Sequence, residues 1–530
     1  MRHHGEGIGY MVSILRSERL GRRGTALPLA VGLLLACGVF VAASDTADGG
    51  GSDQVTGGDL VVLTAQDLYG FDPLKLIPSF AGGAQGYATY DPLMRQNADA
   101  SIEPFLAESL ASEDAQTWTI GLRDGITFTD GTPLDAEAVK INIERHMVQE
   151  NSSIAYSLAQ NIESVTVVDA KTVELTTKFP WPAVPLMLAS TIGMIASPTA
   201  IESGTLNEAP VGTGPFTLEE RLPGDHTTFV RNDNYWRDGE PYLDSITFRS
   251  LADDIVRQTS IEQGEVDVAQ AGVPNILGQA EADGFAVTRG FPTPVTIQFN
   301  TRNAPLDNVD VRRALAMALD YDVINDVMYD GSATVTHSML SEESPYFDSD
   351  VEYPDTNVDE ATDLIADYEA SNGPIELTYS SNIDPSRTEL AELVKAMWGA
   401  IGVDVTTDLK EVNSFVQDII SFNYNTAIFT IGAQYLDPDQ QLYQMLHSAG
   451  SSNYSGYSNP EMDAALDAGR SIVEAERTDA YSSVQQLLAE EVPWVTMHAY
   501  GWGWVMSDGV EGLEANPDAS FYPGLVSLKA

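Results

Sequence analysis

Residues 297–320 constrain the fold most, because they predict a strand, a loop and a helix in direct succession. Apolar and polar side chains alternate from Ile297 to Asn300, as they do in a half-buried strand. Asn and Asp residues around Pro305 then favour a loop, since their side chains bond to the nearby backbone. Beyond the loop, apolar residues recur at spacings of three and four and share one helix face: Val311, Ala314, Leu315, Ala318 and Leu319.

Helix and strand periods alternate again along residues 357–431. Apolar spacing predicts a helix around Leu364 and period-two alternation predicts a strand around Leu377. The helix is expected to end at Gly373, because glycine accepts the left-handed cap and the proline that follows cannot continue a helix. This rhythm favours an α/β region with a mainly parallel sheet.

Length and charge limit the classes of protein that the chain can belong to. Its 530 residues exceed the size at which one core stops growing, so two or three domains are expected. The formal net charge is −51, which repels nucleic acid and anionic lipid headgroups and excludes both as expected partners. A solvated acidic surface accounts for this charge better than a specific cation site does.

Motifs of catalysis and metal binding are missing from the sequence. The single cysteine, Cys37, excludes a disulfide within the chain and a cysteine metal site, and no two histidines have the close helical spacing of a zinc site. There is no serine-hydrolase elbow, phosphate-binding loop or zinc-protease motif. We therefore expect a protein without cofactor or metal that is not an enzyme, with a secreted hydrolase as the least favoured alternative.

The first 43 residues predict export from the cytoplasm. Four arginines between Arg16 and Arg23 precede an apolar run from Ala26 to Ala43, which is the layout of a secretory signal. Residues 34–37 resemble a bacterial lipobox, which makes Cys37 the expected site of lipid attachment. Cleavage after Ala43 and an uncleaved membrane anchor remain alternatives. All three place the rest of the chain outside the cytoplasmic membrane.

Residues 44–58 are rich in Gly and Asp and predict a flexible tether after this leader. Further along, Asp135 and Asn459 stand where each is expected to cap a helix. The two glycines of PVGTGPF, residues 210–216, predict a tight turn that feeds a strand rather than a phosphate-binding loop, since no lysine follows.

Several of these stretches resemble recurrent motifs of one protein family. They are LRDG at 122–125, PVGTGPF at 210–216, RNDNYW at 231–236 and VRRALAMALD at 311–320. Together they resemble the family 5 solute-binding proteins of ABC importers, the group that takes up peptides and nickel. The resemblance covers about residues 58–515.

The resemblance implies an α/β, two-lobed periplasmic-binding-protein-like fold of type II, in its large class with an extra subdomain. Lobe I is expected to comprise residues 59–297 and 500–530, with the extra subdomain at about 100–215. Lobe II is expected at residues 298–499, so the chain crosses between the lobes twice. The expected hinge consists of residues 296–300 and 496–501.

The resemblance also suggests which residues bind ligand. In peptide-binding relatives a loop similar to residues 431–439 lies in the cleft, and its aspartate holds the peptide amino group; here Gln434 stands at that position. The expected ligand-binding residues are Gln434, Tyr435, Asp437, Arg387, Trp502 and Trp504. Asp437 and Asp439 are the carboxylates that could replace the missing charge.

Two ligand classes stay open at this stage. The family favours a di- or oligopeptide, captured by lobe closure and delivered to ABC permease subunits. A neutral amide at position 434 gives up a charge-assisted bond, which favours a neutral oligosaccharide or another small organic solute. We expect a monomer that is extracytoplasmic and held at the membrane through its lipid anchor.

Overall fold

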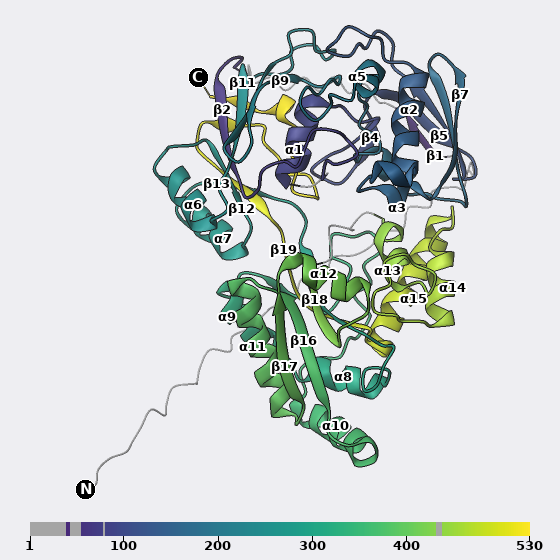
Figure 1. The fold of residues 1–530 in the computed structure, drawn as a ribbon, viewed down its shortest axis with the longest axis vertical. Coiled ribbons are helices and arrows are strands. Elements are labelled where there is room, and N and C mark those ends of the chain that lie inside the picture. Colours follow the sequence, from purple (N-terminus) through teal and green to yellow (C-terminus); the bar gives the residue numbers. More distant parts are fainter. Residues whose placement is uncertain (1–38, 43–54, 78–79, 431–436, 530) are drawn as a thin grey trace, which may run out of the picture. The chain divides into compact units, whose positions relative to one another are not determined.

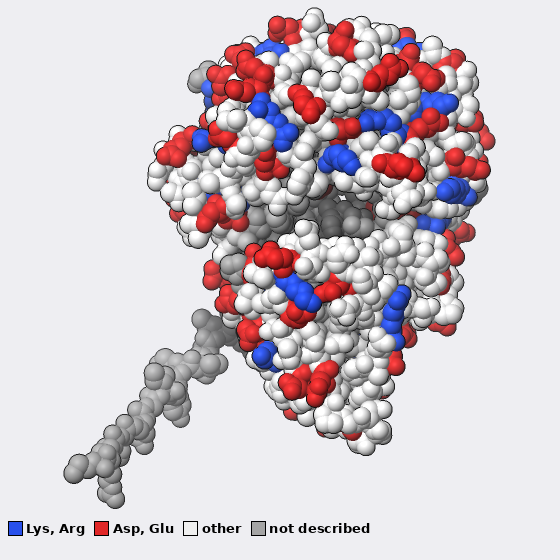
Figure 2. Space-filling view, in the orientation of Figure 1, with Lys and Arg blue, Asp and Glu red and all other residues white. Residues whose placement is uncertain are grey.

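The computed structural model describes residues 39–42, 55–77, 80–430 and 437–529 (Figure 1). Three sheets organise this part of the chain, with seven, five and six strands. Acidic side chains are spread over the face drawn in Figure 2, with fewer basic ones between them. This distribution agrees with the solvated acidic surface that the net charge predicts.

The seven-stranded sheet forms the centre of the first lobe. Its order is β13 (Ala286–Arg289), β20 (Gly503–Met506), β12 (Val268–Ala271), β2 (Asp59–Thr64), β11 (Ser245–Ser250), β10 (His226–Arg231) and β9 (Phe216–Leu222). Strand β2 runs parallel to both neighbours, β11 and β12. Successive β2 side chains enter different cores: Leu60 and Val62 pack with helix α1 (Phe80–Thr89), and Leu63 with α6 (Asp254–Glu262) and α7 (Pro274–Ala282). The sheet is therefore covered on both faces, as a strand period of two allows.

Four strands of a five-stranded antiparallel sheet with its own core lie in the region expected to be the extra subdomain, and the edge strand β1 comes from residues 39–42 of the predicted leader. Its order is β1 (Val39–Ala42), β5 (Ala107–Ser112), β6 (Thr117–Leu122), β8 (Thr172–Thr177) and β7 (Ile162–Asp169). Helix α2 (Ala136–Met147) packs on it through Val139 and Ile143. Asp135 caps this helix as predicted, with its carboxylate accepting from the Ala138 N–H at 2.9 Å.

Short elements complete this half of the chain. They are β3 (Met94–Gln96), β4 (Ile102–Pro104), α3 (Tyr156–Ala159), α4 (Val184–Leu188), α5 (Pro198–Ser203), β21 (Val510–Glu511) and β22 (Ser527–Leu528). The glycines of the 210–216 motif lie against the carboxyl end of α1, because a Cβ on Gly212 or Gly214 would overlap the backbone of Thr89. The motif leads directly into β9, which confirms the tight turn.

The six-stranded sheet belongs to the second lobe. Its order is β15 (Thr334–Val335), β19 (Trp494–Tyr500), β14 (Thr293–Phe299), β18 (Thr426–Thr430), β16 (Glu376–Asn382) and β17 (Asp404–Lys410). Only the pairs β18–β16 and β16–β17 are parallel, and the other three pairs are antiparallel. The strands within residues 357–431, β16, β17 and β18, pair in parallel as predicted. The expectation of a mainly parallel sheet for the whole lobe is wrong, because β14 and β19 join it antiparallel from outside that region.

Helices flank this sheet and form a second cluster beside it. They are α8 (Val309–Met317), α9 (Tyr321–Tyr329), α10 (Val358–Asn372), α11 (Pro385–Ala400), α12 (Val412–Ile420), α13 (Gln444–Leu446), α14 (Pro460–Ala468) and α15 (Glu474–Glu491). Residues 297–320 fold as predicted into the end of β14, a loop and α8, and Asn308 caps α8. Gly373 ends α10 with φ of 87°, and Asn459 caps α14.

The chain crosses between the two large sheets at residues 290–292 and 501–502. The Gly290 N–H donates to the Trp502 carbonyl oxygen at 2.9 Å, and a Cβ on Gly501 would overlap the Gly290 carbonyl. The two crossings therefore lie side by side. The first hinge expected from the sequence, 296–300, lies almost wholly within β14 instead, because this strand pairs with β19 from Thr293 and with β18 from Val295. The second, 496–501, lies within β19 up to Tyr500.

Candidate ligand-binding site

A cavity of about 180 Å³ lies where β2 and β12 end in the first lobe. It is lined by the segment that follows β2, by the start of α1, by Gln270 of β12 and by Trp502 of the second crossing. The carboxyl ends of neighbouring parallel strands are where open α/β sheets bind ligands. Its position next to a crossing makes this cavity the first-lobe part of the candidate site.

Two aromatic rings form one wall of the cavity. The rings of Trp502 and Phe80 have centroids 4.4 Å apart and planes inclined by 38°. Phe80 has a φ of 54°, a left-handed conformation that costs a residue with a side chain roughly 1–2 kcal/mol. Its N–H donates to the Asp518 carbonyl at 3.2 Å, which helps to hold this conformation.

One polar side chain of the cavity is the buried amide of Gln270. Gln270 is 4% exposed, and its Oε1 accepts a hydrogen bond from the Ala65 N–H at 2.9 Å. The cavity therefore combines flat apolar surface with a neutral polar side chain.

On the second-lobe side, Arg387 lies in the first turn of α11 beside a group of buried rings. His498 Nε2 is 2.9 Å from the Tyr329 hydroxyl, and the Tyr329 and Tyr500 rings are 5.2 Å apart. Burial lowers the pKa of His498 to about 3, and the Arg387 charge acts in the same direction, so the imidazole is neutral at pH 7. Burial raises the pKa of Tyr500, while Arg387 opposes the rise.

Tyr500 links this group to the first lobe. Asp254, at the start of α6, also acts on the pKa of Tyr500, and a Cβ on Gly272 would be in contact with both Asp254 and Trp502. The structure thus brings two of the residues expected to bind ligand, Arg387 and Trp502, to opposite ends of one crossing.

Asp437 and Asp439, the carboxylates offered by the sequence for the ligand, lie in a different setting. Asp437 is 2.8 Å from the guanidinium of Arg477, and Asp439 is 2.6 Å from that of Arg470. All four side chains are at most 10% exposed. Burial raises the pKa of Asp437 to about 6 against the opposing effect of Arg477, so at pH 7 the carboxyl is mainly ionised.

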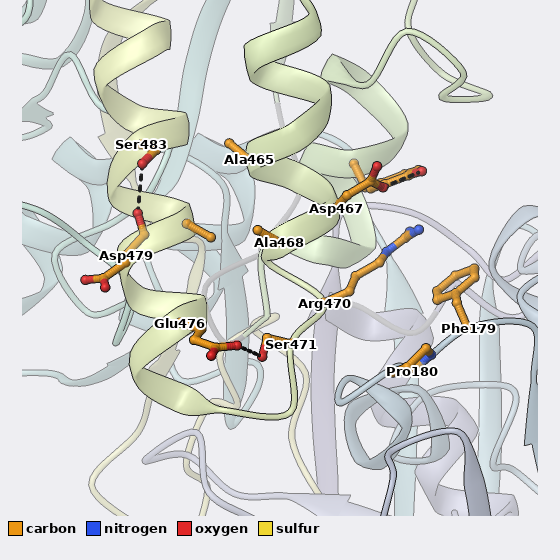
Figure 3. A pocket seen from close by; sticks show the side chains of 12 residues that line it. Phe179, Pro180, Ala465, Asp467, Ala468, Arg470, Ser471, Glu476, Asp479 and Ser483 are labelled. Carbon is orange, nitrogen blue, oxygen red and sulfur yellow. Dashed lines mark hydrogen bonds between the residues drawn. The ribbon is translucent and has the colours of Figure 1, made fainter.

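Arg470 also lies between two aromatic rings. Its guanidinium carbon is 3.3 Å from the ring centroid of Tyr443 and 3.9 Å from that of Phe179, which follows β8 of the extra subdomain. Figure 3 shows Arg470 pointing toward Phe179 at the edge of a groove of about 790 Å³. Such contacts stabilise by about 0.5–2 kcal/mol each.

Other residues expected to bind ligand have different outcomes. Trp504 is fully buried in the first-lobe core and its indole donates to the Ala519 carbonyl at 2.8 Å, so it has no surface for a ligand. Gln434, Tyr435 and Cys37 lie outside the described residues. Asp437 is committed to an ion pair inside the second lobe.

Sequence analysis did not identify Gln270, Phe80, Arg470 or Arg477. Nothing around Gln270 or Phe80 in the sequence distinguishes them from ordinary strand and loop residues. The two arginines carried a weak signal, since the chain has 27 Lys and Arg against 78 Asp and Glu. In so acidic a chain a buried arginine is expected to pair with an acid, and Arg477 is the one that shares a helical spacing with apolar residues, Ala480, Tyr481 and Val484.

The described ranges hold neither a membrane-spanning helix nor a cluster of metal-binding side chains. None of the helices there combines the length and the apolar character needed to cross a membrane. Over the same residues, no three or more His, Cys, Asp or Glu side chains are grouped so that they could hold a metal ion.

Comparison with known families identifies the fold. The model of the bacterial extracellular solute-binding proteins, family 5, middle part, matches residues 101–453, which is more than half of the chain. The chain belongs to this family. It is the solute-binding component of an ABC importer, and the relatives found are binding proteins, not enzymes. The expected two-lobed class of fold is confirmed by the solved structures that the chain resembles.

Three relatives illustrate the likeness. The glutathione-binding protein GsiB of Shigella flexneri is 27% identical over 481 residues, which cover 87% of this chain and 93% of the relative. The periplasmic binding protein DppA of Helicobacter pylori, solved with the peptide STSA, has a TM-score of 0.77 at 22% identity and covers 90% and 99% of the two chains. The dipeptide-binding protein of Pseudoalteromonas sp. SM9913, solved with Met-Leu, has a TM-score of 0.76 at 22% identity and covers 89% and 100%.

Proposed function

We propose that this family 5 protein captures di- or oligopeptides outside the cytoplasmic membrane and delivers them to its permease subunits. The relatives named above bind glutathione, STSA and Met-Leu, and all three ligands are peptides. Capture needs no chemical step, because a ligand that contacts both lobes stabilises the closed form by its differential affinity.

One observation carries the choice of peptide: a cation acts on Tyr500 at one end of the second crossing, and an amide and an aromatic ring line the cavity at its other end. Arg387 contributes a positive charge from the second lobe, which a ligand carboxylate complements. Gln270 and Trp502 contribute an amide and a flat ring from the first lobe. A neutral oligosaccharide, the alternative that the sequence leaves open, would use the amide and the ring but gain nothing from the charge.

Calorimetric titration with dipeptides that have free or amidated carboxyl termini tests the proposal. We expect free dipeptides to bind about tenfold tighter or more, and Arg387→Gln to remove that difference. Arg313→Gln is the matched control, because Arg313 is an exposed arginine of the same lobe. Tight binding of a neutral oligosaccharide such as maltotriose, with no binding of any dipeptide, would overturn the proposal.

Gln434 and Tyr435 enter the proposal from the sequence alone. Gln434 stands where peptide-binding relatives carry the aspartate that holds the amino group, so Gln434→Ala should weaken binding and Gln434→Asp should favour ligands with a free amine. Titration with amino-blocked and unblocked dipeptides measures this preference. An unchanged ratio in Gln434→Asp contradicts the placement of Gln434.

Cys37 is proposed to carry the lipid that holds a monomeric protein at the outer face of the membrane. In that case Cys37→Ser releases the protein from the membrane fraction into the soluble extracytoplasmic fraction. Retention of the Cys37→Ser variant in washed membranes contradicts lipid attachment at this residue.

A further inference from the structure

The two charged residues that line the first-lobe cavity are both engaged with the backbone. The Asp67 carboxylate accepts from the Leu68 N–H at 2.8 Å and the Gly224 N–H at 2.9 Å. Lys75 Nζ donates to the carbonyl oxygens of Asn151 at 3.1 Å and Ser152 at 2.6 Å. Both charges thus hold the loop after β2 in place, which makes the cavity a poor match for a charged ligand group.

Among the uncharged polar side chains of the lining, Gln66 and Tyr69 are exposed and Gln270 is the buried one, and the orientation of its amide is fixed by chemistry. The Ala65 N–H can only donate, so the amide oxygen of Gln270 must face it and the amide nitrogen must face away. Within residues 39–42, 55–77, 80–430 and 437–529, Nε2 donates no hydrogen bond, and it is not one of the fully buried unpaired atoms, so a ligand can reach it in the cavity that Gln270 lines. An accessible donor whose partner oxygen is fixed favours a ligand that brings an acceptor.

The apolar part of the cavity suits one large side chain. The whole cavity has a volume of about 180 Å³, which corresponds to about six water molecules at roughly 30 Å³ each. The wall is preorganised, because the backbone of Trp502 is held by Gly290 and that of Phe80 by Asp518. A flat ring on such a wall gains contact area at little cost in side-chain entropy.

We propose that this cavity is a specificity subsite for one large, uncharged side chain of the bound peptide. The side chain packs against Trp502 and Phe80, and Gln270 Nε2 donates to a neighbouring carbonyl oxygen of the ligand. This inference rests on the proposed function and adds the substrate class, namely peptides with an aromatic or large aliphatic residue. Peptides with Lys or Glu at the same position are disfavoured, because the cavity has no free charge to pair with them.

A dipeptide series read by calorimetry tests the subsite. The probes are Ala-Ala, Ala-Phe, Phe-Ala, Ala-Lys, Lys-Ala, Ala-Glu and Glu-Ala, so that each class of side chain is presented at both positions. We expect Phe at one of the two positions to bind about tenfold tighter or more than Ala, and Lys or Glu there to bind no tighter than Ala.

Three variants assign the effect to named side chains. Trp502→Ala should bring the Phe-to-Ala affinity ratio close to one, while Trp502→Phe keeps most of the ratio. Gln270→Glu retains the acceptor for Ala65 but places a carboxylate where the donor was, so it should weaken every dipeptide about tenfold or more. Gln263→Glu adds the same charge at an exposed position of the first lobe and should change nothing.

The outcomes separate the subsite from the function. Tight dipeptide binding with a Phe-to-Ala ratio near one, or with a ratio that Trp502→Ala leaves intact in a variant with a native circular dichroism spectrum, overturns the subsite and leaves the proposed function standing. A native protein that binds none of the dipeptides overturns both. Loss of the ratio in Trp502→Ala with its retention in Trp502→Phe supports the subsite.

Discussion

The first-lobe cavity and the Asp437–Asp439 segment both hold buried polar side chains, but they treat them in opposite ways. In the segment each carboxylate has an arginine within 2.8 Å, so every charge is compensated inside the protein. In the cavity the Gln270 amide accepts from Ala65 at one end, and the nitrogen at its other end donates to none of the described residues. Compensated charge stabilises a fold, whereas an available donor serves a ligand.

This contrast argues against Asp437 as the carboxylate that holds a ligand. A ligand ammonium could pair with Asp437 only in competition with Arg477, whose charge is already in place. We therefore infer that the ion pairs of Asp437 and Asp439 serve the architecture of the second lobe, and our proposal gives ligand contact to the cavity and to the Arg387 side. The predictions below test that division.

The largest effect is expected from Arg477→Met. It leaves the Asp437 carboxylate buried without its counter-charge, which costs about 3–5 kcal/mol of unfolding free energy. Urea denaturation measures this loss. Arg249→Met removes an exposed arginine and should change the stability by less than about 0.5 kcal/mol. If the two variants were equally stable, the ion pair would not be structural.

The pH dependence of stability gives the next largest effect. The folded pKa of Asp437 is about 6, above the usual value of 3.8, so the folded state takes up the proton first. Stability therefore increases as the pH falls from about 6 to about 4, by up to about 3 kcal/mol for this group.

Asp437→Asn has no such proton to bind. The difference in unfolding free energy between the native protein and this variant should shift toward the native protein by up to that amount on acidification. Thermal and urea denaturation at pH 7 and pH 4 measure the shift. A difference that stays constant would mean that Asp437 titrates normally in the folded protein.

Trp502 of the second crossing and Trp504 of β20 should separate stability from binding. Trp504→Phe loses the bond to Ala519 and some core volume, so it should cost about 1–3 kcal/mol of unfolding free energy without changing ligand affinity. Trp502→Ala should weaken ligand binding and leave the unfolding free energy nearly unchanged, because Trp502 lines the cavity. Denaturation and calorimetry on the same two samples decide it, and a weaker affinity in Trp504→Phe would contradict the assignment of Trp504 to the core.

The smallest effect is expected from Arg470→Lys. Lysine keeps the positive charge beside Asp439 but loses the flat contact with Phe179 and Tyr443, which should cost about 1 kcal/mol. Phe179→Leu removes the same contact from the other side. If the contact is real, the two changes together should cost less than the sum of the single changes in a double-mutant cycle.

Much of the fold could be predicted because its signals are local. The predicted caps at Asp135 and Asn459 need only an oxygen next to the first helical turn, and Gly373 needs only the absence of a Cβ. Spacings of two and of three to four fix which side chains of an element face a core. None of these features depends on the neighbours of an element in space.

The site could be predicted only in part, because its geometry depends on distant segments. Arg387 and Trp502 were found by resemblance, but the mixed order of the second-lobe sheet and the crossing at residues 290–292 were not. Trp502 and Trp504 look alike in the sequence, and only strand β20 decides that one lines a cavity while the other lies in the core.

The sequence by itself determined the elements, their caps and turns, the family and the acidic surface, because each follows from neighbouring residues or from totals. Only the tertiary structure decided which polar groups are compensated. It paired Asp437 with Arg477, 40 positions away, and it brought Ala65 to Gln270 across two adjacent strands. Pairing energy depends on distance and burial, and those are properties of the folded chain rather than of the order of its residues.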